Sequence, residues 1–94
     1  FALMKSTAII INTAHGNLID EQALYNALRD GTIAGAGLDL LTNLDPSNPL
    51  LTLNNVVFTP HVAFYTEESE RNRADILVQN VIAFIEGQPI NVVN

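Results

Sequence analysis

The sequence predicts an α/β protein with a mostly parallel sheet. Three short apolar runs alternate with two segments of helical periodicity, which is the order expected when helices connect parallel strands. The first apolar run, residues 8–11, is continuous, as in a strand that is buried on both faces. Because the chain has 94 residues, it forms at most one small domain, and three strands make a thin sheet for an independent fold.

In the first half of the chain, residues 1–6 are expected to form the tail of a helix, and Asn12 stops the strand that follows. Asp20 is a good N-cap for the next helix, because its carboxylate can accept a backbone N–H of the first turn. Gly31 is placed to end that helix. Gly16, between the strand and this helix, is expected to supply the unusual backbone dihedrals of a tight turn.

In the second half, residues 33–41 are predicted to form a strand whose small side chains allow close approach to the backbone. Residues 43–48 carry turn chemistry, and residues 56–58 are predicted to form a third short strand. Thr66 is predicted to cap a long helix that ends at Gly87. One face of this helix is apolar, and its residues are predicted to pack in the core: Ala74, Leu77, Val78, Val81, Ile82 and Ile85.

The composition excludes several classes of partner. The formal net charge is −6, from four basic and ten acidic residues, so nucleic acids and anionic membranes are not expected to bind. The absence of cysteine excludes disulfides and thiolate metal sites. No apolar run reaches about 18 residues, so no membrane span is expected, and the opening residues lack the pattern of a signal peptide. A cytoplasmic location is therefore the default prediction.

Polar clusters follow all three predicted strands: residues 13–16 after the first, Asp39 at the end of the second, and His61 after the third. The carboxyl ends of parallel strands share an edge where ligands gather, so these groups are expected to converge on one cleft. Each also has a purely structural explanation, because either histidine can be a capping or surface residue and Asp39 can cap a turn. The two histidines and the aspartate lack a close spacing such as HxxxH, so no metal site is predicted.

The order of these motifs resembles the D-isomer-specific 2-hydroxyacid dehydrogenases. The resemblance runs from about Leu3 to Asn94 and rests on an NTxxG turn, the helix start Ile19-Asp20-Glu21, the strand GAGLD and the element TPH. It implies a partial Rossmann-like doubly wound parallel sheet. Residues 1–94 would then be the C-terminal half of an NAD-binding domain, with the last few residues leading back to a substrate domain. The family's GxGxxG phosphate loop is not found in this sequence.

The resemblance also implies roles for individual residues. His61 matches the family's general acid/base, which exchanges a proton with the substrate oxygen while nicotinamide exchanges a hydride, and a histidine suits this role because it titrates near the working pH. Asp39 matches the aspartate that contacts the nicotinamide carboxamide. Further residues match the wall of the cofactor pocket, namely Thr13, Ala14, His15, Val62 and Ala63. NAD is the implied cofactor, and NADP stays open because residues upstream of this segment decide between the two.

Two positions depart from the family pattern. His15 stands where the family has an arginine that grips the substrate carboxylate with two parallel hydrogen bonds, and a histidine offers fewer donors. The glutamate that partners the catalytic histidine falls at Leu44 in this sequence. Asp45 is the neighbouring acidic residue and can take its place if the loop shifts by one position. The catalytic set implied by the resemblance is therefore His61, His15 and Asp45.

Three functional hypotheses follow. The leading one is a fragment of an NAD-dependent oxidoreductase acting on a D-2-hydroxy acid or 2-keto acid, inactive on its own and a homodimer when full length. A second is a catalytically silent paralogue that binds a dinucleotide as a sensor or scaffold, which the two departures favour. A third is a non-enzymatic α/β interaction module, which leaves the polar residues at the strand ends unexplained. The sequence does not identify the particular hydroxy acid.

Overall fold

The computed structural model describes residues 1–43 and 45–93. The chain divides into two compact units, Phe1–Ala63 and Phe64–Asn94, and each is considered by itself. The first unit contains β1 (Ile9–Asn12), the 3-10 helix η1 (Gly16–Leu18), α1 (Glu21–Arg29), β2 (Gly35–Leu38), the 3-10 helix η2 (Pro49–Thr52) and β3 (Val56–Phe58). The second contains α2 (Glu67–Ile85). No helix among the residues described is long and apolar enough to cross a membrane.

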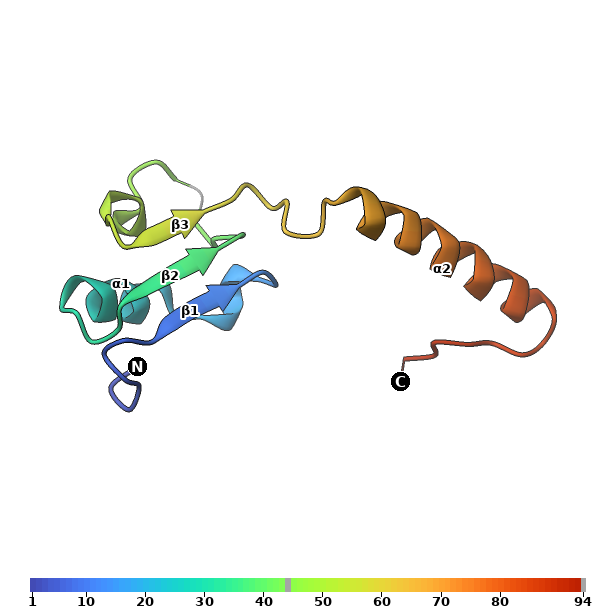
Figure 1. Ribbon diagram of the computed structural model, residues 1–94, viewed down its shortest axis with the longest axis horizontal. Coiled ribbons are helices and arrows are strands. Elements are labelled where there is room, and N and C mark those ends of the chain that lie inside the picture. The colour runs from blue at the N-terminus through green and yellow to red at the C-terminus, as the bar shows by residue number, and fades with distance from the viewer. Residues whose placement is uncertain (44, 94) are drawn as a thin grey trace. The chain divides into compact units, whose positions relative to one another are not determined.

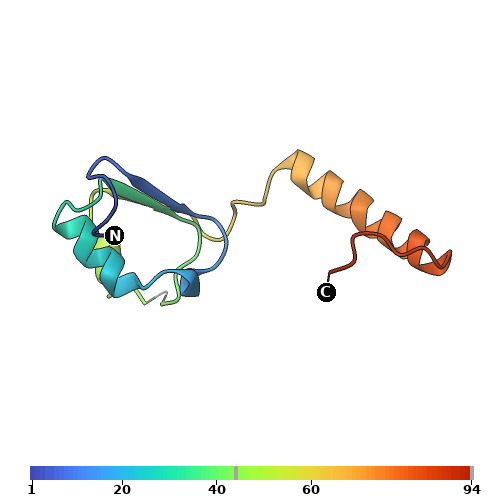
Figure 2. The same ribbon diagram turned by 90° about the horizontal axis from the view of Figure 1, so that it is seen from below.

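The three strands form one parallel sheet in the order β1-β2-β3 (Figure 1). Ile10, Ala36 and Val56 are register neighbours across it. They face a core that α1 completes from one side of the sheet (Figure 2). The buried core consists of Leu24, Ala27, Leu28, Ile33, Ala36, Leu38, Leu41 and Leu50. The predicted α/β class with a parallel sheet is confirmed.

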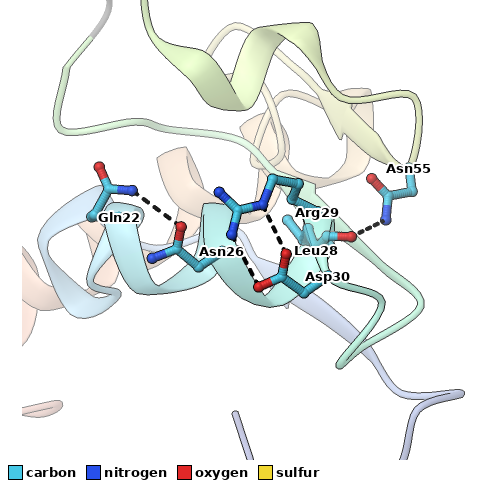
Figure 3. Close-up of polar contacts among 6 residues, drawn as sticks. All are labelled: Gln22, Asn26, Leu28, Arg29, Asp30 and Asn55. Carbon is cyan, nitrogen blue, oxygen red and sulfur yellow. Dashed lines mark hydrogen bonds and ion pairs between the residues drawn. The ribbon is translucent and has the colours of Figure 1, made fainter.

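Local signals set the limits of α1. The side chain of Asp20 accepts the N–H of Ala23 at 2.9 Å, as an N-cap does. Gly31 follows the helix with a φ of 69°, in the left-handed region that glycine adopts without strain. The side-chain amide of Asn55 donates to the carbonyl oxygen of Leu28 at 3.3 Å and to that of Ala34 at 3.2 Å. Asn55 therefore ties the end of α1 to the turn before β3; Figure 3 shows its bond to Leu28.

Two sequence predictions for the first unit are wrong. Residues 1–6 form turns, with Met4 N–H donating to the Phe1 carbonyl oxygen at 2.8 Å, because so short a stretch cannot offset the unfavourable nucleation of a helix. The first strand is buried on one face only, since Ile9 and Ile11 are 64% and 69% exposed. Side chains alternate along a strand, and α1, the one α-helix described in this unit, covers the opposite face.

In the second unit, α2 starts as predicted but does not bury its apolar face. Thr66 caps the helix by accepting the N–H of Ser69 at 3.1 Å, and Gly87 beyond its end has a φ of 74°. The predicted core packing is wrong, because an apolar stripe is hidden only against another element and α2 is the one helix described in residues 64–93. The stripe residues that are half exposed or more are Leu77, Val78, Val81, Ile82 and Ile85.

Candidate functional site

The ends of the three strands meet at one edge of the sheet. The N–H of Asp39 donates to the carbonyl oxygen of Asn12 at 3.0 Å, and the N–H of Thr59 donates to that of Leu38 at 3.0 Å. The residues that follow β1, β2 and β3 therefore start side by side. This confirms the expectation that the polar clusters share the carboxyl edge of a parallel sheet.

The turn after β1 is shaped by Asn12, whose importance the sequence did not reveal. Its side-chain amide donates to the carbonyl oxygen of His15 at 2.8 Å, and its Oδ1 accepts the N–H of Ala14 at 3.1 Å. Asn12 itself is buried. These bonds hold Thr13, Ala14 and His15 in a fixed turn with exposed side chains. An asparagine at the end of an apolar strand is the signal that would have identified this role.

Asp39, directly after β2, is 4% exposed and accepts hydrogen bonds from three groups of the third turn. Its Oδ1 accepts the hydroxyl of Thr59 and, at 2.9 Å, the N–H of Val62, and its Oδ2 accepts the N–H of Ala63 at 3.0 Å. The Thr59 hydroxyl, together with these two N–H groups and the charge of His61, holds the pKa of Asp39 below its usual value, while burial opposes this. Asp39 is therefore an ionised carboxylate at neutral pH.

His61 occupies an unusual backbone conformation. Its φ is 57°, in the left-handed region that few residues other than glycine adopt. Its N–H donates to two carbonyl oxygens, that of Asp39 at 2.8 Å and that of Thr59 at 3.0 Å. Thr59 thus contacts Asp39 through its side chain and His61 through its backbone, a role that its position in the TPH element did not indicate by itself.

The sequence predicts that His15, Asp39 and His61 share one cleft, but the structure has two adjoining cavities at this edge of the sheet. One, of about 480 Å³, is lined by Asp39 and His61 together with the apolar side chains Leu38, Leu40, Leu41, Leu51 and Phe58. The other, of about 380 Å³, is lined by His15, Gly16 and Asn17 with Leu40, Leu41 and Thr42. Leu40 and Leu41 line both cavities. His61 and Asp39 therefore share one cavity, while His15 belongs to its neighbour.

Gly16 is required by space rather than by backbone dihedrals. It is not among the described residues with a positive φ, contrary to the sequence prediction. A Cβ at this position would lie 2.4 Å from the backbone nitrogen of Thr42 and 2.6 Å from the carbonyl carbon of Leu41. Glu21 secures the same loop, because its carboxylate accepts the N–H of Thr42 and, at 3.1 Å, the side-chain amide of Asn48.

Asp45 lies in this loop and is engaged locally. Its Oδ1 accepts the N–H of Ser47 at 2.8 Å, and this bond lowers the pKa of Asp45. Its own N–H donates to the side-chain oxygen of Asn43 at 2.9 Å. Asp45 is not one of the residues lining the cavity of His61. Leu44, where the family pattern has a glutamate, lies outside the described residues. The pairing of Asp45 with His61 stays a prediction.

Within residues 1–43 and 45–93, no cluster of three or more histidine, aspartate or glutamate side chains is arranged to hold a metal ion. The chemistry available at this edge is that of an imidazole beside a buried, ionised carboxylate and an apolar cavity. Apolar cavities with a few polar side chains are typical of small-molecule sites, and an imidazole is the side chain that most often exchanges protons in catalysis.

Comparison with known proteins identifies the family. The sequence model described as "D-isomer specific 2-hydroxyacid dehydrogenase, NAD binding domain" matches residues 1–63. A glyoxylate reductase of Korarchaeum cryptofilum is 47% identical over 94 residues, covering 97% of this chain and 28% of that protein. A glycerate dehydrogenase of Methylorubrum extorquens is 49% identical over 94 residues, covering 96% of this chain and 30% of that protein. The chain thus spans less than a third of the length of these curated relatives.

Solved structures give the same result. An acyclic imino acid reductase in complex with NADPH and D-Arg superposes with a TM-score of 0.91 at 46% identity, over 99% of this chain and 30% of that one. A D-isomer specific 2-hydroxyacid dehydrogenase from Lactobacillus delbrueckii ssp. bulgaricus, in its NAD complex, gives a TM-score of 0.74 at 43% identity, over 97% of this chain and 33% of that one.

Proposed function

The chain belongs to the D-isomer specific 2-hydroxyacid dehydrogenase family, and from that premise we propose that it is part of an oxidoreductase that transfers a hydride between a nicotinamide cofactor and a D-2-hydroxy acid or its 2-keto acid. The observation that carries this proposal is the position of His61. It lies at the carboxyl edge of the sheet and lines an apolar cavity together with the buried carboxylate of Asp39.

The chain is proposed to be the C-terminal half of a dinucleotide-binding domain, with its last few residues leading back to a substrate domain. The coverage of less than a third of the relatives' length supports this. The family match also ends at residue 63, where the first compact unit ends.

The residues present suit a nicotinamide cofactor. The family model that matches residues 1–63 is that of an NAD-binding domain. Of the two solved relatives, the imino acid reductase is bound to NADPH and the 2-hydroxyacid dehydrogenase to NAD. The cavity of about 480 Å³ is lined by six apolar residues, which suit a flat ring: Leu38, Leu40, Leu41, Leu51, Phe58 and Pro60. The proposed pocket wall consists of Thr13, Ala14, His15, Asp39, His61, Val62 and Ala63. When bound, the cofactor supplies or accepts the hydride.

His61 is proposed to carry the proton. In reduction it gives a proton to the carbonyl oxygen of the keto acid, and in oxidation it takes the proton back from the hydroxyl group. His15 is proposed to hold the substrate carboxylate in place of the family's arginine. Its cavity shares the lining residues Leu40 and Leu41 with the cavity of His61, which supports the assignment of both histidines to one substrate site. Asp45 is proposed as the acidic partner of His61, which requires the loop to move.

A second substrate class is suggested by one relative. The imino acid reductase with a TM-score of 0.91 is bound to a D-amino acid, and reduction of a carbon–nitrogen double bond needs the same two transfers, a hydride to carbon and a proton to nitrogen. We therefore include an imino acid, formed from a 2-keto acid and an amine, in the substrate panel. Turnover that requires the amine would identify this class.

A homodimer and a cytoplasmic location are proposed for the whole protein. The homodimer follows the family, and light scattering of the purified protein tests it. The location follows the default prediction from the sequence, and cell fractionation tests it.

The test uses the whole protein that contains this chain, with reduced NAD or NADP and a panel of glyoxylate, hydroxypyruvate and longer 2-keto acids. We expect His61→Gln to lower kcat by about 10²- to 10⁴-fold, because general acid–base catalysis supplies about that factor. Binding of the reduced cofactor, measured by its fluorescence, should change little.

The second histidine of the chain provides the matched control. His15→Gln removes an imidazole at the same edge of the sheet, and it should raise KM for the acid more than it lowers kcat. If the wild type binds the reduced cofactor but turns over none of the panel, the chain is part of a dinucleotide-binding sensor or scaffold instead. If His61→Gln keeps a near-normal kcat, another group carries the proton.

A further inference from the structure

Backbone hydrogen bonds to the neighbouring strands fix Asp39, independently of its side-chain contacts with the turn after β3. Its N–H pairs with the carbonyl oxygen of Asn12 at 3.0 Å, and the preceding residue, Leu38, accepts the N–H of Thr59 at 3.0 Å. Asp39 is therefore held by the strands on both sides of β2. With an exposure of 4%, its side chain has little room to move. A carboxylate fixed in this way can serve as an anchor for a neighbouring segment.

The segment that follows β3 makes four hydrogen bonds to this single residue. Three go to the carboxylate, from the Thr59 hydroxyl, the Val62 N–H and the Ala63 N–H. The fourth goes from the N–H of His61 to the carbonyl oxygen of Asp39. Donors thus come from both sides of His61 and from His61 itself. Bonds to a charged acceptor are stronger than those between neutral groups.

These bonds explain how His61 keeps a left-handed backbone. For a residue with a Cβ this conformation is unfavourable, and it persists only where the surroundings impose it. His61 has a φ of 57°, and its neighbours on the chain are tied to Asp39. The direction in which its side chain leaves the backbone follows from φ and ψ. The placement of the imidazole beside the cavity thus depends on Asp39.

We propose that Asp39 is a positioning residue for His61, whose carboxylate holds residues 59–63 in the turn that aims the imidazole at the substrate. This proposal rests on the proposed function and adds to the cofactor contact implied by the family pattern. A carboxylate has about four lone-pair sites, and donors among the described residues use three of them, so the positioning role and the cofactor contact do not exclude each other.

Thr59 lines the same cavity as Asp39 and His61, but its hydroxyl donates to the Asp39 carboxylate, so variants that change only this hydroxyl test the contact with Asp39. In the whole protein, Thr59→Val removes the hydroxyl donor but keeps the branched shape, and Thr59→Ser keeps the donor. We expect Thr59→Val to lower kcat by about 10- to 100-fold, because a small misplacement of a catalytic group has effects of that size. Cofactor affinity should stay near the wild-type value, and Thr59→Ser should retain most of the activity.

Hydrogen exchange gives a readout that does not need turnover. In Asp39→Asn the amide group replaces one acceptor oxygen by a donor. Val62 and Ala63 donate to different oxygens, so at least one of these two amides loses its acceptor and should exchange roughly tenfold faster or more. The Thr59 amide, which bonds to a backbone carbonyl, should keep its protection. Faster exchange at all three amides would indicate general loosening of the sheet and would overturn the proposal. Unchanged exchange at Val62 and Ala63 would overturn it too.

The kinetic outcomes are equally decisive. If Thr59→Val weakens cofactor binding and leaves kcat intact, Asp39 acts through the cofactor and not through His61, and the proposal fails. If the wild-type protein turns over none of the acids with either cofactor, the proposed function fails. The exchange measurement still tests whether Asp39 holds the turn in that case.

Discussion

The backbone N–H of His61 donates to the carbonyl oxygen of Asp39 over 2.8 Å. This bond joins the histidine that follows β3 to the residue directly after the central strand β2, and both residues line one cavity. A left-handed histidine tied to a buried aspartate combines the proposed proton carrier with the residue proposed to position it. The predictions below test the parts of this arrangement separately.

The lowered pKa of Asp39 predicts an acid-dependent loss of stability. Because the folded pKa lies below the usual value of 3.8, the ionised carboxylate adds stability above that pH, and this is lost as pH falls through the folded pKa. The free energy of unfolding of the wild type should therefore exceed that of Asp39→Asn at neutral pH, and the difference should shrink in acid. Urea unfolding of both proteins across the acid range measures it.

His61 and Asp30 supply the controls for this measurement. The charge of His61 contributes to the lowered pKa of Asp39, so the comparison is repeated in a His61→Ala background. Asp30 also has a lowered pKa, from its ion pair with Arg29 (Figure 3). That pair is on the surface, and Asp30→Asn should change the stability curve much less. Parallel curves for wild type and Asp39→Asn would show that the Asp39 carboxylate does not support the fold.

Replacing His15 by arginine should strengthen substrate binding. A guanidinium offers two parallel, charged hydrogen bonds to a carboxylate, and each gain of about 1.4 kcal/mol is tenfold in affinity. The wild type should lose affinity as rising pH removes the imidazole proton, whereas His15→Arg should not. Binding of an unreactive analogue such as oxamate, measured from about pH 5 to about pH 9, tests both statements.

His15→Lys is the matched control, because it keeps a positive charge without the paired geometry. It should lose the pH dependence but bind less tightly than His15→Arg. Equal affinities and equal pH profiles for all three proteins would mean that another group holds the carboxylate.

Asp45→Asn isolates the charge of the loop aspartate. An asparagine keeps the oxygen that accepts the Ser47 N–H, so the turn and the unfolding midpoint should be preserved. If Asp45 partners His61 as proposed, kcat should fall and its pH profile should shift. The pH dependence of kcat/KM for both proteins measures this. An unchanged profile would assign Asp45 to the turn alone.

Gly16→Ala should destabilise the first unit by about 1–3 kcal/mol, the usual effect of overpacking. The added Cβ would meet backbone atoms of Leu41 and Thr42 within 2.6 Å, and backbone moves less readily than a side chain. Urea unfolding measures the loss. A Cβ added at Gly31 would meet no heavy atom of the described residues within 4 Å, apart from its chain neighbours, and asparagine tolerates the left-handed φ, so Gly31→Asn should have a smaller effect. Equal effects of the two substitutions would contradict the close approach.

The sequence by itself determined the elements whose signals are local. Asp20 and Thr66 cap helices because their acceptors lie three residues from the N–H groups they satisfy. The apolar runs before Asn12 and Thr59 became strands, and the polar residues after them reached one edge because parallel strands share their direction. These features depend on neighbours in the sequence, so a pattern of a few residues is enough to predict them.

The tertiary structure decided what depends on residues far apart in the chain. Asp39 and Thr59 are 20 positions apart, and their hydrogen bond exists only because β2 and β3 are paired. Gly16 lies against the backbone of Thr42, which is far from it in the sequence. The sequence therefore does not show this contact, and it suggested unusual dihedrals at Gly16 instead. The apolar face of α2 also shows what a sequence pattern leaves undecided. Its periodicity predicts a surface that can be buried, but burial requires a second surface, and periodicity does not say which one.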